Sequence, residues 1–126
     1  MGYRSQVVLA ISKHLIPFIL LATSKNKATE ELVFENTNNF DRNYGGDKSW
    51  LMAWDSIKWY DSYEDIHTIM EFVEKATEDL IEFEIDGHPQ CSSEHIRFVQ
   101  VGEEPTDITI LGDSFWDIYP HTSINY

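Results

Sequence analysis

His88, Cys91 and His95 have the spacing in this 126-residue chain that most resembles a metal-binding motif. A thiolate and imidazoles are ligands that zinc prefers, but a structural zinc site takes four ligands. The chain has one cysteine, so Glu84, Asp86 or a distant histidine would have to complete the set. The same segment also fits a polar turn whose side chains face water. We therefore predict no cofactor, and keep His88, Cys91 and His95 as candidate metal ligands.

Cys91 is also a candidate nucleophile, which would need a histidine base close to it in space. His95 and His121 are the candidate bases, and either would give a Cys91-dependent hydrolase or transferase. The sequence neighbours of Cys91 carry no positive charge that would lower the pKa of its thiol. No phosphate-binding glycine loop, nucleophile elbow or HExxH motif is present. The sequence therefore predicts a protein that is not an enzyme, with the Cys/His enzyme as the alternative.

The formal net charge is −13 and is unevenly distributed. Residues 1–60 hold seven Lys or Arg and six Asp or Glu, whereas residues 61–126 hold two and sixteen. The net charges of the two halves are therefore +1 and −14. Such a field repels the phosphates of nucleic acids, whose binding depends on Lys and Arg. It attracts basic protein surfaces instead, so we expect a protein partner and no direct nucleic-acid binding.

The acidic half begins with a predicted helix from about residue 62 to residue 80. Apolar side chains recur there at three- and four-residue spacing, which is typical of a helix with one buried face. Like-charge pairs on its outer face, such as Glu74 with Glu78, cost helix stability. Helix stability therefore does not explain these acids, and we predict that they contact a partner. The predicted contacts are Glu64, Glu71, Glu74, Glu78, Asp79 and Glu82.

Three of the four tryptophans lie just before this helix, between residues 50 and 60. Alternation places Trp50 and Trp54 on one face of a predicted strand. Aromatic residues in such a strand are more often core than surface, because each buries a large area. If no helix covers that face, it becomes an exposed patch of the kind that marks partner sites. We therefore add Trp54, Trp59 and Tyr60 to the predicted partner-binding surface.

The order of predicted elements indicates an α+β fold in a single domain, residues 1–126. We expect a mostly antiparallel sheet of about four strands, with two or three helices packed on one face. Strands are predicted at 3–11, 49–53 and 94–101, with a short strand or helical turn at 107–111 and a final edge strand formed by 115–119 and 123–126. A strand is also favoured at 81–85. A bulge or turn is predicted at Asp55-Ser56.

Helices are predicted at 13–24, after the N-cap Ser12, and at a short segment capped by Thr29. Asp61 or Ser62 is predicted to cap the acidic helix. Residues 36–48 are rich in Asn, Asp and Gly, which favours a loop. No apolar run reaches the roughly 18 residues of a membrane span, and the amino terminus lacks the pattern of a signal peptide. One cysteine fits a reducing compartment, so we expect a cytoplasmic protein without a membrane partner.

Two segments resemble those of a group of short bacteriophage-encoded proteins: residues 2–7, Gly-Tyr-Arg-Ser-Gln-Val, and residues 54–60, Trp-Asp-Ser-Ile-Lys-Trp-Tyr. Members of that group open with Gly-Tyr-Arg-Ser, an acid and Val, and carry Trp-x-x-Ile-Lys-Trp-Tyr in mid-chain. They also have a Phe/Val-rich strand ending in Gly-Glu, which residues 97–103 match. Gln6 replaces the acid here, which weakens any role that needs a negative charge at that position.

The resemblance implies a small accessory protein that acts in the cytoplasm of an infected bacterium. Together with the charge, it predicts binding to a host protein, as a counter-defence inhibitor or as a trigger recognised by a host immune sensor. The acidic helix would then occupy a groove built for nucleic acid. A self-associating structural protein, joined through the tryptophan-rich face or the carboxy-terminal edge strand, is a further alternative, so a homo-oligomer is compatible with the sequence.

Overall fold

The computed structural model describes residues 3–104, 106–120 and 124–125, and its centre is a five-stranded sheet. The strand order is β2-β3-β1-β6-β7, and all neighbouring strands are antiparallel. These strands are β1 (Ser5–Ile11), β2 (Asn39–Tyr44), β3 (Ser49–Ile57), β6 (Ile96–Val101) and β7 (Ile108–Gly112). The predicted α+β class is confirmed, and the sheet has five strands where about four were predicted.

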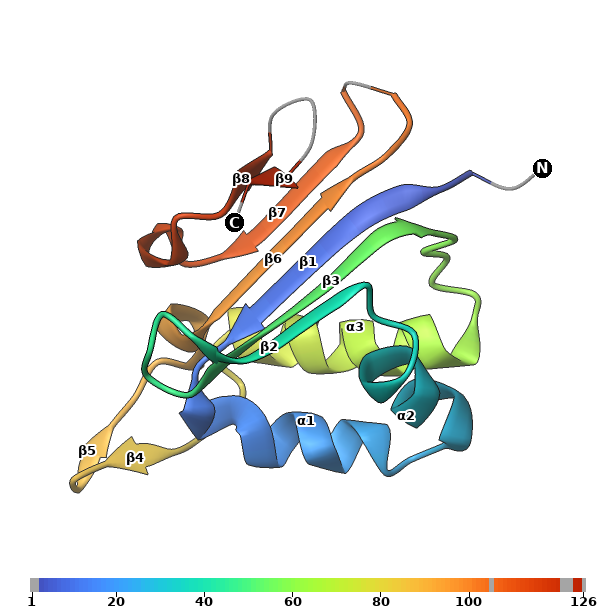
Figure 1. Cartoon of the computed structure of the whole chain (residues 1–126). Helices are drawn as coiled ribbons and strands as arrows, with labels where there is room; N and C mark the ends of the chain where they lie inside the picture. Colours follow the sequence, from blue (N-terminus) through green and yellow to red (C-terminus); the bar gives the residue numbers. More distant parts are fainter. Residues whose placement is uncertain (1–2, 105, 121–123, 126) are drawn as a thin grey trace.

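Three α-helices lie on the same side of this sheet in Figure 1. They are α1 (Ile16–Thr23), α2 (Lys27–Phe34) and α3 (Glu64–Thr77), and the 3-10 turns are η1 (Lys13–Leu15), η2 (Ser92–His95) and η3 (Ser114–Trp116). The buried side chains of the three α-helices share one core with alternate residues of the central strands. Leu9, Trp54 and Phe98 are examples of these strand residues. Alternation along each strand directs these side chains to a common face. Within the described residues, no helix is both long and apolar enough to cross a bilayer.

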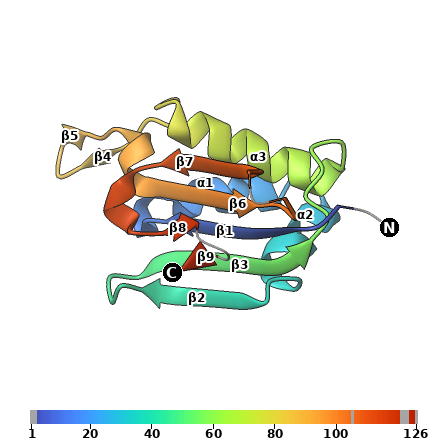
Figure 2. The same ribbon diagram turned by 90° about the horizontal axis from the view of Figure 1, so that it is seen from above.

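The other face of the sheet carries smaller side chains, including Val8, Ala10 and Ala53. Ile118 and Ile124 pack on it, from the segment that holds β8 (Tyr119–Pro120) and β9 (Ile124–Asn125). In the view from above, these two short strands lie over the sheet on the side away from the helices (Figure 2). The second face is therefore covered by the end of the chain.

The predicted carboxy-terminal edge strand is wrong. Residues 114–116 form η3, and Asp117 then adopts a left-handed conformation (φ 54°) that turns the chain away. Tyr119–Pro120 pairs with Ile124–Asn125 in a separate two-stranded ladder, while β2 and β7 are the edges of the main sheet. Residues 121–123 and 126 lie outside the described residues.

The predicted loop at residues 36–48 contains the edge strand β2. Its composition misleads because an edge strand with polar, exposed side chains needs few apolar residues. Phe40 anchors it, with its ring centroid 5.1 Å from that of Trp50 and 6.0 Å from that of Phe34. The tight turn that follows has positive φ at Gly45, Gly46 and Lys48.

The predicted irregularity at Asp55-Ser56 is confirmed as a bulge in β3. Ser5 pairs with Ile57 and Val7 pairs with Trp54, so the step in β3 is one residue longer than that in β1. Such a bulge bends the strand and increases its twist.

The caps predicted for α2 and α3 are wrong, although both helices form. Asn26, not Thr29, caps α2 by accepting the Thr29 N–H at 2.8 Å. Tyr63 is the N-cap residue of α3 and makes no side-chain capping bond. The Asp61 carboxylate instead lies 3.4 Å from Nδ1 of His67.

A short hairpin follows α3 and projects from the body of the molecule in Figure 1. It consists of β4 (Glu84–Ile85) and β5 (His88–Pro89), so the strand predicted at 81–85 is confined to its last two residues. Asp86 and Gly87 both have positive φ, the backbone that a tight two-residue hairpin turn needs and that Asp-Gly favours.

Candidate functional site

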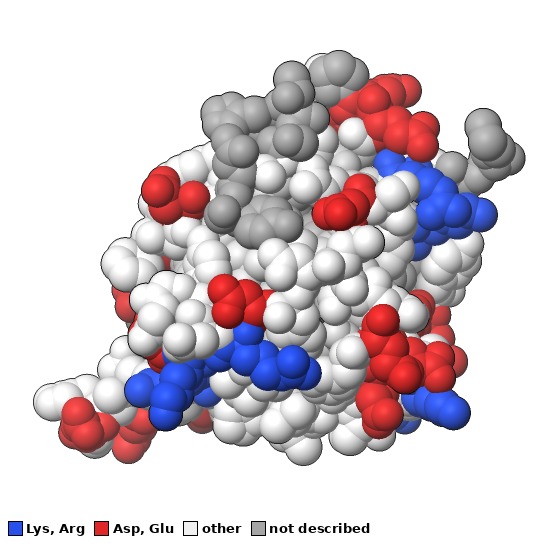
Figure 3. Space-filling model, in the orientation of Figure 1, with Lys and Arg blue, Asp and Glu red and all other residues white. Residues whose placement is uncertain are grey.

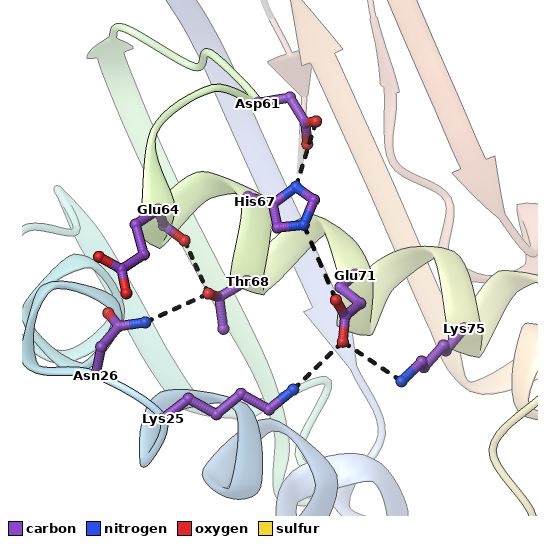
Figure 4. Close-up of polar contacts among 8 residues, drawn as sticks. All are labelled: Lys25, Asn26, Asp61, Glu64, His67, Thr68, Glu71 and Lys75. Atoms are coloured by element: carbon purple, nitrogen blue, oxygen red, sulfur yellow. Dashed lines mark hydrogen bonds and ion pairs between the residues drawn. The ribbon is translucent and has the colours of Figure 1, made fainter.

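The acidic face of α3 is balanced by basic residues near its middle. Oε1 of Glu71 lies 3.3 Å from Nζ of Lys25 and 3.4 Å from Nζ of Lys75, as Figure 4 shows. The hydrogen bond from Lys25, with the charge of Lys25 and the contact with Lys75, lowers the pKa of Glu71. Glu71 therefore acts within the fold, tying α3 to the connection between α1 and α2.

The start of α3 is joined to α2 by hydrogen bonds. Asn26 Nδ2 donates to Thr68 Oγ1 at 3.4 Å, and that hydroxyl donates to the Glu64 carbonyl at 2.8 Å (Figure 4). These bonds join the start of α2 to α3. The Glu64 side chain is exposed and makes no ion pair among the described residues.

The charge balance is different where α3 ends. Glu74, Glu78 and Glu82 are exposed, and none of them makes an ion pair within the part of the chain that is described. Asp79 is used locally, because its carboxylate accepts the Ser93 N–H at 2.9 Å, which lowers the pKa of Asp79. Leu80 is 62% exposed among these acids. The predicted acidic residues are thus divided between a structural cluster and an unbalanced surface.

Two of the three predicted aromatic contacts are core residues, so this part of the predicted surface is wrong. Trp54 is 1% exposed and its indole Nε1–H donates to the Leu32 carbonyl at 3.0 Å. Trp59 is 8% exposed and packs with its ring centroid 5.2 Å from that of Trp54. The helices cover this face, which leaves neither indole available to a partner. Tyr60 is half-buried, and its hydroxyl accepts the Tyr3 N–H.

His88, Cys91 and His95 do not form a metal-binding group. Among the described residues, no three or more His, Cys, Asp or Glu side chains are placed to hold a metal ion. His88 and Cys91 are exposed, whereas His95 is half-buried and has hydrogen-bond partners at both ring nitrogens. His121 lies outside the described residues.

A cavity of about 480 Å³ lies where the carboxyl end of β1 meets the turn after β2, a volume within the range of small-molecule sites. Figure 1 places η1, η2 and η3 at this same end of the sheet. The cavity is lined by Ser12, Lys13, His14, Tyr44, Gly45, Asp47, Ser49, Glu94, His95, Phe115 and Trp116. No local motif indicated it, because its residues come from four separate stretches of the chain.

The side chains of Ser12 and His95 are in hydrogen-bond contact in this cavity. Ser12 Oγ lies 2.9 Å from His95 Nδ1, and the Ser12 N–H donates to the His95 carbonyl at 2.9 Å. Burial, and the nearby charge of His14, lower the pKa of His95. The predicted capping role of Ser12 is confirmed, since its Oγ accepts the His14 N–H.

Three segments meet at the opposite end of β1: residues 4–6, 55–56 and 101–103. The Arg4 N–H donates to Glu103 Oε1 at 2.9 Å, and the Arg4 guanidinium donates to the Ser56 carbonyl at 3.3 Å. A shallow depression of about 270 Å³ lies between these segments. Gln6 Oε1 accepts the Ile124 N–H at 2.9 Å.

Comparison of the chain with protein-family models, curated proteins and solved structures gives no significant match.

Proposed function

We propose that this protein is a small bacteriophage accessory protein that docks on a basic surface of a host protein. The proposed contact is the acidic corner, defined as Glu74, Glu78, Glu82, Glu84 and Asp86. It runs from the last turns of α3 onto the projecting β4–β5 hairpin. Figure 3 shows acidic side chains at this projecting corner. The observation that carries the proposal is that the chain between residues 76 and 96 has six acids and no Lys or Arg.

The contrast with Glu71 supports a role in binding. Where α3 packs on its neighbours, the Glu71 carboxylate forms ion pairs with Lys25 and Lys75. At the acidic corner, by contrast, Glu74 and Glu78 lie four residues apart at the end of α3 with no ion pair in the described residues, and such a like-charge pair costs helix stability. Leu80 is exposed beside them, and a partly apolar centre within a charged rim is the usual anatomy of a protein interface. These features favour a basic protein surface over solubility alone.

A nucleic-acid-binding groove of a host nuclease or another defence factor is the partner that we propose. Its Lys and Arg side chains would meet carboxylates where phosphates otherwise sit. Binding would then inhibit the host factor by competition or, if that factor is an immune sensor, activate it. Electrostatic attraction of this kind accelerates association and weakens as salt screens the charges. The proposed partner-binding surface therefore lies at the end of α3 and no longer includes the aromatic strand.

The test is an affinity pull-down from bacterial host lysate at low and high salt. We expect a protein with a basic surface to bind at low salt and to be lost at high salt. The variant Glu74→Gln/Glu78→Gln/Glu82→Gln should bind it at least about tenfold more weakly, at roughly 0.5 kcal/mol for each exposed charge.

A matched control is Glu30→Gln/Glu35→Gln/Asp55→Asn, which removes the same charge from exposed positions elsewhere. It should retain binding, and added duplex DNA should compete with the wild-type protein. Equal loss in both triple variants would assign the effect to net charge and not to the acidic corner. Capture that persists at high salt and in the first variant would contradict the proposed contact.

A further inference from the structure

Ser12 and His95 line the cavity at the end of β1, and several contacts fix their positions. The Ser12 N–H bonds to the His95 carbonyl, so the two residues are joined through the backbone as well as through their side chains. The ring of Phe83 packs against His95 with the centroids 4.9 Å apart. Both side chains are half-buried and both line the cavity. This pair therefore faces a space that a small molecule can enter.

The hydrogen bonds of Gln90 provide the basis for assigning a tautomer to His95. Gln90 Nε2 donates to the His88 carbonyl at 3.1 Å, which directs Gln90 Oε1 toward His95 Nε2 at 3.4 Å. An amide oxygen only accepts, so we assign the hydrogen of the neutral His95 ring to Nε2. Nδ1 is then unprotonated and accepts from the Ser12 hydroxyl. The chain is Ser12 Oγ–H to His95 Nδ1, and His95 Nε2–H to Gln90 Oε1.

We propose that this cavity is an acyl-transfer site in which Ser12 is the nucleophile, His95 the general base and Gln90 a positioning residue. A nucleophile bonded to a base, with the base oriented by a third group, is the arrangement that activates serine in enzymes. The capping role of Ser12 uses only a lone pair of Oγ. Its proton remains directed at His95, so the two roles are compatible.

The reaction needs no group from outside the chain except water and an ester. Ser12 Oγ forms a bond to the ester carbonyl carbon while its proton moves to His95 Nδ1. The bond to the leaving alcohol then breaks, and the alcohol takes that proton. Water attacks the acyl-serine as its proton moves to His95 Nδ1, and the carboxylic acid departs as Ser12 regains its proton.

The lining of the cavity indicates the class of ester. Tyr44, Phe115 and Trp116 form an aromatic wall, with Phe115 83% exposed at its edge. These rings favour an ester with an aryl or another flat apolar group. Lys13 is the lysine in the lining, and its ammonium group is a positive charge available to a developing oxyanion. None of these residues belongs to the acidic corner, so the two proposals stand or fail separately.

The experiment is covalent labelling of the full-length protein with a fluorophosphonate ester, read by intact mass and peptide mapping. We expect one adduct, on Ser12. Ser12→Asn should abolish it, because Asn preserves the helix cap but supplies no hydroxyl. His95→Gln should slow labelling about 100-fold, the smaller end of the range for general-base catalysis. Ser24→Ala, which changes an exposed serine outside the cavity, is the control and should label normally.

The pH profile separates a base from a merely structural histidine. Labelling should increase as His95 loses its proton, with a midpoint below pH 6.5, because burial lowers the pKa of His95. His14 and Glu94 are the charged groups that act on His95, with Lys13, Asp47 and Tyr44 elsewhere in the lining. A folded wild-type protein that takes no label, or an adduct retained in Ser12→Asn, overturns the proposal. So does a rate in His95→Gln equal to that of the wild type.

Discussion

Trp54 and Trp59 are in contact in the core but differ in the state of their indole N–H groups. That of Trp54 donates to the Leu32 carbonyl, whereas Nε1 of Trp59 is buried without a hydrogen-bond partner in the described residues. Both Trp→Phe changes remove similar volume, so their difference isolates the hydrogen bond. Trp54→Phe should lower the free energy of unfolding by about 1–3 kcal/mol more than Trp59→Phe, because it leaves the Leu32 carbonyl unsatisfied.

Urea denaturation of the two variants measures this difference. Equal losses would mean that the Leu32 carbonyl finds another donor in Trp54→Phe. A larger loss for Trp59→Phe would contradict the hydrogen-bond assignment.

The residues of the candidate sites show what single-residue patterns can predict. The capping role of Ser12 was predictable because a cap depends on its immediate neighbours. Its contact with His95 was not, since 83 residues separate the two positions. The tryptophans were placed on the correct common face of β3, but alternation alone does not show what covers that face.

At the scale of elements, α3 is joined to the connection between α1 and α2 by Lys25 and Glu71. Glu71→Gln should lower stability slightly at neutral pH, because the pairs are solvent-exposed. The lowered pKa of Glu71 determines how its contribution to stability changes with pH. Its contribution is present above the ordinary pKa of 4.5 and is lost as the pH falls through the lower folded-state pKa. The wild type and the variant should therefore converge in acid.

Thermal unfolding of both proteins between pH 7 and pH 3 checks this convergence. The control is Glu74→Gln, because Glu74 lies about one turn from Glu71 and makes no ion pair in the described residues. Its stability difference from the wild type should not disappear in acid. A difference for Glu71→Gln that persists in acid would mean that its carboxylate acts by packing and not by charge.

Elements with a strong pattern were predictable and those with a weak pattern were not. The continuous apolar run of β1 and the helical spacing of α3 both predicted the observed element. β2 was missed because its exposed, polar sequence resembles a loop. The carboxy-terminal ladder was not predictable from alternation, because the chain turns at Asp117 in a left-handed conformation and Ile118 then packs on the sheet.

At the scale of the whole molecule, the net charge of −13 opposes compaction, since like charges are closer together in the folded state. Salt screens this repulsion and also the few ion pairs near Glu71. Because acids far outnumber basic residues, the repulsion dominates. Raising NaCl from 0.1 to about 0.5 M, where the screening length falls from roughly 10 Å to a few ångströms, should therefore increase Tm.

The acidic-corner variant Glu74→Gln/Glu78→Gln/Glu82→Gln makes this prediction specific. It removes repulsion where acids are densest, so its Tm at low salt should exceed that of the wild type and should respond less to NaCl. Calorimetry of both proteins across the salt series measures this. If the variant is no more stable than the wild type, the acids of this corner do not repel one another appreciably. The contrast with the balanced Glu71 cluster would then no longer support a binding role. A gain in Tm together with lost partner capture would instead show that this surface retains charge at the expense of stability.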